Sequence, residues 1–111
     1  MERVARAYSR YGQEAVRVLG QAIRINRLER KLSVAELAER VGVSRDMMRR
    51  IEAGDPRCAI GVAFEAASIV GVTLFEEDRS NLTMLLAEHN EKLRLLPKAI
   101  HKARTAVKDD F

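Results

Sequence analysis

The sequence predicts an all-α fold, and three observations lead to that prediction. The 111 residues are rich in Ala, Leu, Glu and Arg, which form helices well, and the 47% that are hydrophobic are enough for a modest core. Aromatic residues are few, with three Phe, two Tyr and no Trp, and runs of β-branched residues are rare. Residues 32–54 also carry two helix start signals and two helix stop signals in close succession. A chain of this length suits one domain with extensions.

The first helix is predicted over residues 11–31, where positions recur at the three- and four-residue steps of an amphipathic helix. These positions are Val16, Leu19, Gly20, Ile23, Arg27 and Lys31. Ile23 and Leu28 are expected to point toward the helices that follow. We interpret this helix as scaffold.

The second helix is predicted to begin near Val34. Ser33 and Glu36 form a capping box, in which each side chain accepts a hydrogen bond from the backbone amide of the other residue. Gly42 ends the helix, because glycine tolerates the left-handed conformation of a helix C-terminus. The apolar face between these two signals consists of Leu37, Ala38 and Val41.

The third helix follows after a turn of three residues. Ser44 is its N-cap, and Met48 and Ile51, three residues apart, give it an inward face. It is expected to end at Gly54, with Pro56 just beyond. Two short helices joined in this way form a helix-turn-helix.

Two more helices are predicted before a polar joint. Residues 59–71 read as a buried helix that Gly71 closes, with apolar positions at Ile60, Phe64, Ala67 and Ile69. Thr73 and Glu76 repeat the capping-box spacing and predict a short helix around Leu74 and Phe75. The acidic run that follows marks the end of the domain.

The last helix is predicted over residues 80–96, before Pro97. It carries a stripe at three- and four-residue steps, formed by Leu82, Leu85, Leu86, His89, Leu93 and Leu96. A leucine stripe must be buried, either against the core or in a two-fold dimer interface. We interpret His89 as a hydrogen-bonded side chain that fills space within the stripe.

Charge singles out the third helix, whose outward residues are Arg45, Asp46, Arg49 and Arg50. The first turn of a helix favours acids by about 0.3–1 kcal/mol per charge, yet Arg45 opens this one and forms a like-charge pair with Arg49. A neighbouring polyanion would remove both penalties. Arginine can also donate to O6 and N7 of guanine together in the major groove. A solvated basic face is the alternative.

The stretch GVSRDMMRRIEAG and the capped helix before it resemble the Xre family of lambda-repressor-like helix-turn-helix proteins, over residues 19–75. The resemblance implies a bundle of about five helices whose second motif helix enters the major groove. It places Arg45, Asp46 and Arg50 toward base edges and Arg49 nearer the DNA backbone. The family often pairs an arginine of its first helix with a glutamate late in the recognition helix, and Arg27 and Glu52 match those places. Where the family usually has a phosphate-contacting glutamine, this chain has Val34.

Arg50 and Arg45 are the predicted base readers. Asp46 lies one turn before Arg50 and either orients its guanidinium or accepts from cytosine N4. Met47 either contacts a thymine methyl or fills a partly buried position. The predicted DNA-binding residues are therefore Ser44, Arg45, Asp46, Met47, Arg49 and Arg50.

The net charge of +4 is unevenly distributed. Residues 1–53 hold 12 Lys and Arg against 7 Asp and Glu, whereas residues 54–111 hold 8 against 9. The basic excess accompanies the motif, as expected for a footprint on phosphates. Arg3, Arg6 and Arg10 form either an arm along the DNA backbone or a frayed end.

Other classes of function lack their signatures. No apolar run approaches the ~20 residues of a membrane span and no secretory signal opens the chain, so a cytoplasmic protein is expected. Cys58, the only cysteine, is either a small apolar filler or an intermolecular redox site. His89 and His101 lack metal-ligand spacing. Without a catalytic motif, we expect no enzyme activity, no metal and no cofactor.

The tail, residues 98–111, is too polar for a core. Together with the GVTLFEED joint and the LLPKAI segment, it resembles HipB-like antitoxins, the Xre-type partners of HipA-type kinase toxins. The resemblance implies an antitoxin that represses its own operon. Val107, in a short strand, and the aromatic anchor Phe111 would then bind the toxin. A disordered tail without a partner is the alternative.

Together these observations predict a lambda-repressor-like five-helix DNA-binding bundle with an added C-terminal helix and tail. Residues 1–78 are the DNA-binding domain, residues 79–97 a helix for dimerisation and residues 98–111 a partner-binding tail. The predicted function is a sequence-specific repressor that binds a palindromic operator in double-stranded DNA as a homodimer, with a HipA-type kinase toxin as partner. The alternatives are a stand-alone Xre-type regulator and a protein-interaction adaptor without specific DNA binding.

Overall fold

The computed structural model describes residues 7–75 and 79–100, which form five α-helices. They are α1 (Arg10–Glu29), α2 (Val34–Val41), α3 (Arg45–Glu52), α4 (Ile60–Ile69) and α5 (Arg79–Leu95). The chain divides into two compact units, Met1–Glu76 and Glu77–Phe111. The first unit contains α1 to α4, and the second contains α5. The prediction of an all-α fold is confirmed.

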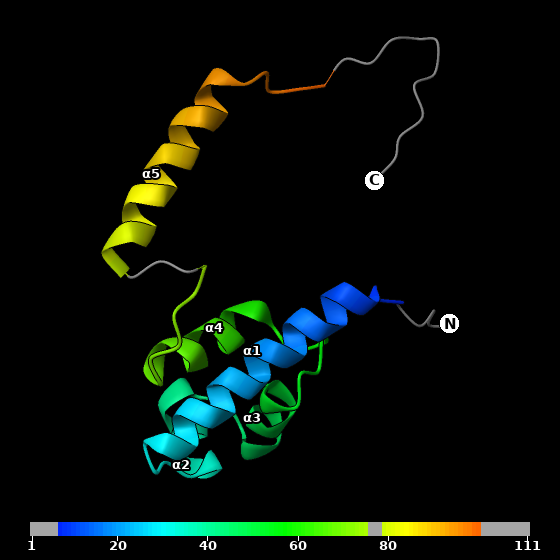
Figure 1. The fold of residues 1–111 in the computed structure, drawn as a ribbon, viewed down its shortest axis with the longest axis vertical. Helices are drawn as coiled ribbons and strands as arrows, with labels where there is room; N and C mark the ends of the chain where they lie inside the picture. The colour runs from blue at the N-terminus through cyan, green and yellow to red at the C-terminus, as the bar shows by residue number, and fades with distance from the viewer. Residues whose placement is uncertain (1–6, 76–78, 101–111) are drawn as a thin grey trace. The chain divides into compact units, whose positions relative to one another are not determined.

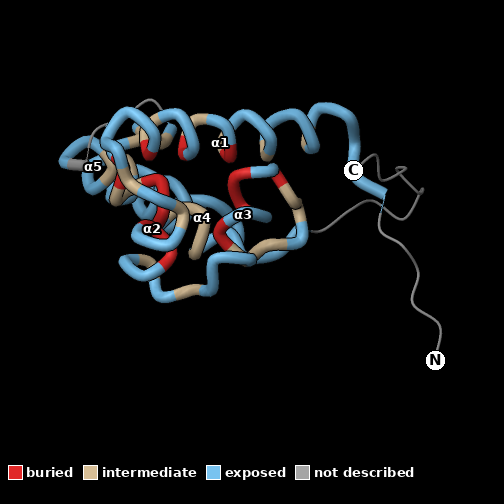
Figure 2. Tube along the Cα trace, turned by 90° about the horizontal axis from the view of Figure 1, so that it is seen from below, coloured by how far each residue is buried: buried red, intermediate tan, exposed pale blue. Residues whose placement is uncertain are grey.

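The core of the first unit lies where its four helices meet. Both α1 and α2 pack against α3 and α4 (Figure 1). The largest fully buried side chains come from α1, α2, α3 and the C-cap of α4. They are Ile23, Leu37, Met48 and Val70. Figure 2 shows the buried positions of α1 on the side that faces α3. The core therefore fixes the orientation of α3 from its inner side.

Helix α1 and helix α3 approach each other closely at Gly20. A Cβ atom at this position would lie 2.5 Å from the carbonyl oxygen of Ile51 and 2.7 Å from that of Glu52. These distances are shorter than any van der Waals contact that a methyl group can make. Only glycine fits here, because the backbone at the end of α3 occupies the space that a side chain would need.

Two residues that the sequence predicted to point inward are exposed. Leu28 is 54% exposed and Ile60 is 70% exposed. Leu28 follows Arg27, and because successive residues of a helix point about 100° apart, the buried Arg27 leaves Leu28 outside the interface. Ile60 is the first residue of α4 and lies beyond the core, which α4 reaches at Ala66 and Ala67.

The short helix predicted around Leu74 and Phe75 is not formed. Phe75 has a φ of 58°, in the left-handed region, and neither residue is helical. The Phe75 ring packs edge-on against Phe64, with centroids 6.0 Å apart and an interplanar angle of 85°. Edge-on ring contacts of this kind are favourable, and this one accompanies the turn. Glu76, the other half of the predicted cap, lies outside the described residues.

The second unit contains α5, which begins and ends within one residue of the predicted bounds. Leu82, Leu85, Leu86, His89 and Leu93 lie within this helix, and Leu96 directly follows it. In the described part of the chain, no helix combines the length and the apolar character needed to cross a membrane.

Candidate nucleic-acid interface

The start of the helix-turn-helix is fixed by local hydrogen bonds. The Ser33 hydroxyl accepts from the amide of Glu36 at 3.0 Å, and the Glu36 carboxylate accepts from the amide of Ser33 at 2.7 Å. These hydrogen bonds to Ser33 lower the pKa of the Glu36 carboxyl, because they favour its charged form. The predicted capping box is confirmed. At the other end of α2, Gly42 adopts a φ of 90° and its amide donates to the carbonyl of Ala38 at 2.8 Å, as predicted.

Helix α3 begins at a second cap and buries its inner face. The Ser44 hydroxyl accepts from the amide of Met47 at 3.0 Å. Met48 and Ile51 are buried in the core, and Met47 is half-buried against it. Met47 therefore fills a partly buried position, and its contact with a thymine methyl stays a prediction. The outward side of α3 remains in solvent.

That outward side carries the predicted base readers. Arg45, Asp46, Arg49 and Arg50 are all exposed. The Arg50 guanidinium lies 3.1 Å from the Asp46 carboxylate, one turn earlier on the same face. This is the contact that the first role predicted for Asp46 requires, and both roles stay predictions. The guanidinium groups of Arg45 and Arg49 form no ion pair with any described residue.

A buried ion pair joins α1 to the end of α3. The Arg27 Nε atom lies 2.6 Å from one Glu52 carboxylate oxygen and Nη2 lies 3.0 Å from the other. Arg27 Nη1 also donates to the carbonyl of Leu32 at 2.8 Å. The two side chains are only 8% and 6% exposed. The pairing that the resemblance implied is confirmed, and it ties the recognition helix to the scaffold.

A groove opens beside this ion pair, on the side of α3 that carries Arg49. Its volume is about 300 Å³, and its lining residues are Arg24, Arg27, Val34, Arg49, Glu52 and Ala53. Arg24 was not among the predicted site residues. Its position one turn before Arg27 on α1 could have indicated it, because residues three apart share a helix face.

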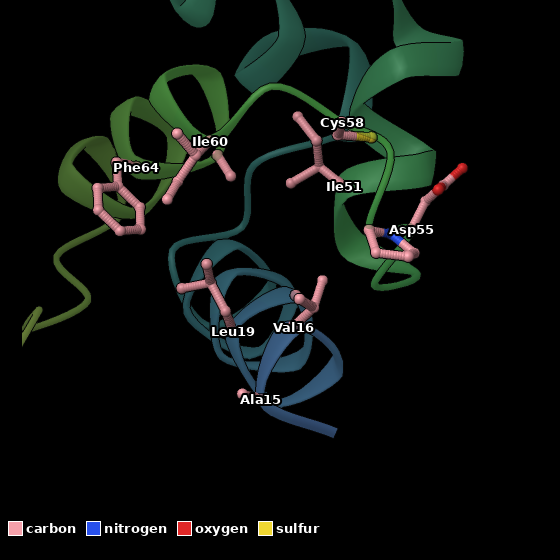
Figure 3. A pocket seen from close by; sticks show the side chains of 11 residues that line it. Ala15, Val16, Leu19, Ile51, Asp55, Cys58, Ile60 and Phe64 are labelled. Carbon is pink, nitrogen blue, oxygen red and sulfur yellow. The ribbon is translucent and has the colours of Figure 1, made fainter. Parts of the chain in front are cut away.

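A second cavity, also of about 300 Å³, has a different character (Figure 3). Apolar side chains of α1, α3 and α4 line most of it, among them Val16, Ile51 and Phe64. Its acidic residue, Asp55, is already paired with Arg57 at 3.0 Å, and the Arg57 side chain lowers the pKa of Asp55 to about 2. This cavity offers no cationic side chain to a nucleic acid.

Cys58 lies at the edge of this apolar cavity, half-buried against the core. Burial raises the pKa of its thiol, so the less reactive protonated form is favoured at neutral pH. The environment of Cys58 agrees with the first of its two predicted roles, a small apolar side chain that fills space.

The remaining predicted site residues lie at the ends of the chain. Arg10 is the first residue of α1 and forms an exposed ion pair with Glu14 at 3.4 Å. Arg3 and Arg6 of the predicted arm, and Val107 and Phe111 of the predicted partner-binding tail, lie outside the described residues.

One comparison with known proteins identifies the family. A family model described as a helix-turn-helix domain matches residues 18–82, more than half of the chain, and this match contains α2, α3 and α4 entirely. No curated protein and no solved structure matches the chain significantly. The match and the two capped helices around a left-handed glycine agree with each other. The chain therefore belongs to the helix-turn-helix domain family, a family of DNA-binding regulators.

Proposed function

We propose that this protein is a sequence-specific transcriptional repressor that binds a palindromic operator as a homodimer. The observation that carries the proposal is the exposed arginine face of α3, on a helix that is held by a cap, by the core and by the buried pair of Arg27 with Glu52. A recognition helix gains affinity when its backbone is held in place before DNA arrives, because ordering it on binding would cost free energy. Helix α3 is held in this way.

Arg50 is the best-placed base reader. The Asp46 carboxylate approaches Nη2 of Arg50, at 3.1 Å, so Nε and Nη1 of the guanidinium remain available to donate to O6 and N7 of a guanine. The contact also restricts the rotamers of a long side chain, which lowers the entropic cost of binding. We assign Arg45 as the second base reader and Arg49 as a phosphate contact.

Loss of Arg50 and loss of Arg49 are expected to affect DNA binding differently. Arg50→Ala should cost about 1–3 kcal/mol at one base pair and relax specificity there. Arg49→Ala should weaken binding to all sequences alike and reduce the slope of log affinity against log salt by about 1. Dissociation constants for operator and random duplexes, measured over a series of salt concentrations, separate these effects. Equal losses on operator and random DNA for both variants would contradict the assignment.

Selection of binding sites from a random duplex pool, at near-physiological salt, tests the function itself. The expected product is an inverted repeat with half-sites about one helical turn apart. Recovery of no motif would overturn the proposal. It would favour an adaptor that uses the same fold to bind a protein, and such binding would ignore DNA and persist at high salt.

Dimerisation is assigned to the leucine stripe of α5, where Leu86 and Leu93 are exposed. Leu86→Asp should convert the dimer to a monomer, because it would bury a carboxylate in an apolar interface. Ala87→Asp is the matched control, since it adds the same charge to the same helix about 100° away from Leu86. Analytical ultracentrifugation measures the mass of each variant in solution and shows whether it is a monomer or a dimer. A dimeric Leu86→Asp variant would exclude this interface.

The antitoxin role rests on the sequence alone. Its support is the resemblance of residues 98–111, together with the GVTLFEED joint and the LLPKAI segment, to HipB-like antitoxins. A neighbouring reading frame for a HipA-type kinase would distinguish an antitoxin from a stand-alone Xre-type regulator.

A further inference from the structure

Three helices build the groove beside the recognition helix. Arg24 and Arg27 come from α1, Val34 opens α2, and Arg49 and Glu52 come from α3. The groove therefore exists only in the folded protein, and no single sequence segment contains it. Its lining carries three guanidinium groups and one carboxylate.

The charges of this groove do not cancel. The Glu52 carboxylate accepts two hydrogen bonds from Arg27, at 2.6 Å and 3.0 Å, and is nearly fully buried. Its charge is therefore already compensated by Arg27, and it forms no ion pair with Arg24 or Arg49. Both of these residues are exposed, and neither forms an ion pair within the described part of the chain. Two unpaired positive charges thus line one groove of about 300 Å³.

The hydrogen-bonding groups of the groove point to the class of ligand. Val34 provides an apolar wall without a side-chain donor. Arg27 is buried and already donates through Nε, Nη1 and Nη2, so Arg24 and Arg49 are the exposed donors of the lining side chains. Guanidinium groups bind phosphate with charge-assisted, often bidentate hydrogen bonds. The groove also adjoins the arginine face of α3 through Arg49, which belongs to both surfaces.

We propose that this groove binds one phosphodiester group of the DNA backbone, and that Arg24 and Arg49 donate to it jointly. Arg24 is then a positioning residue that fixes the register of α3 in the major groove. The contact carries no sequence information, because every nucleotide has the same phosphate. The inference rests on the proposed DNA binding and adds the site by which the scaffold helix takes part in it.

Binding by full-length Arg24→Ala, Arg49→Ala and the double variant, to operator and random duplexes, tests the proposal. Arg24→Ala should weaken both duplexes by the same factor and reduce the salt slope by up to about 0.9, the value for one phosphate. Between about 50 and 200 mM salt, the wild type would then lose about 3.5-fold more affinity than the variant. If both arginines hold one phosphate, the salt slope of the double variant should also be smaller than that of the wild type by about 0.9, rather than by about twice that value.

Arg40→Ala is the matched control, because Arg40 is an exposed arginine of α2 that does not line the groove. Thermal melting shows whether each variant is folded. If Arg24→Ala binds with the same salt slope as Arg40→Ala, or if the slope losses of the single variants add, the shared phosphate site is overturned while the proposed function stands. If the wild type itself binds no DNA, both proposals fail.

Discussion

Glu52→Ala is expected to destabilise the protein by about 3–5 kcal/mol, the typical cost of removing one partner of a buried ion pair. Glu52 is the only partner that neutralises the Arg27 guanidinium among the described residues. Once the carboxylate is gone, a charge that is 92% covered would lose its counterion and two hydrogen bonds, at 2.6 Å and 3.0 Å. A guanidinium does not lose its proton in proteins, so deprotonation offers no relief from this cost.

A double variant separates the charge from the packing. Arg27→Met with Glu52→Leu removes both ions and keeps apolar volume in their place, and such replacements are often neutral or stabilising. The carbonyl of Leu32 would lose its 2.8 Å hydrogen bond from Arg27, which costs about 1 kcal/mol. The double variant should therefore be more stable than Glu52→Ala alone. Urea unfolding measures all three proteins, and a Glu52→Ala variant within 1 kcal/mol of the wild type would contradict the argument.

Local signals explain why the helix-turn-helix could be predicted well from the sequence. Each cap of α2 and α3 is built from residues at most four apart, such as Ser33 with Glu36 or Gly42 with Ala38. The hydrogen bonds that begin and end these helices therefore form within short segments, whose residues can be recognised in the sequence. The inward residues Met48 and Ile51 follow from helical spacing in the same way.

Contacts between distant segments explain what the sequence did not predict. The left-handed backbone of Phe75 accompanies a ring contact with Phe64, eleven residues earlier. The groove joins Arg24 to Arg49 through the packing of three helices, and no spacing rule relates those two positions. The pairing of Arg27 with Glu52 spans 25 residues and was expected only because a family resemblance supplied it.

Gly20→Ala is expected to destabilise the protein by about 3 kcal/mol, the upper end of the usual range for overpacking. The added Cβ would lie 2.5 Å and 2.7 Å from the carbonyl oxygens of Ile51 and Glu52, and 3.0 Å from the carbonyl carbon of Glu52. All three atoms belong to the backbone of α3, so no side chain can move aside to make room. Alanine favours a helix over glycine by about 1 kcal/mol, which offsets only part of this cost.

Gly61→Ala is the matched control, because Gly61 also lies within a helix and a Cβ there would meet nothing within 4 Å. This substitution should stabilise the protein by about 0.5–1 kcal/mol, so the two glycine variants should change the free energy of unfolding in opposite directions. A stabilised Gly20→Ala variant, measured by urea unfolding, would show that helix propensity outweighs the clash.

The clash at Gly20 cannot be relieved cheaply, because the same two helices are tied two turns further along α1. Moving α1 away from α3 would stretch the 2.6 Å contact between Arg27 and Glu52, whose charges are buried and have no other ion-pair partner among the described residues. Gly20 and the ion pair thus act together to set one distance, which is the separation of the scaffold helix α1 from the recognition helix α3. For this reason Gly20→Ala should also lower the affinity for DNA under conditions where the variant is fully folded, since Arg24 on α1 and Arg49 on α3 would no longer face one phosphate. Unchanged DNA affinity in a folded Gly20→Ala variant would mean that this separation does not matter for binding.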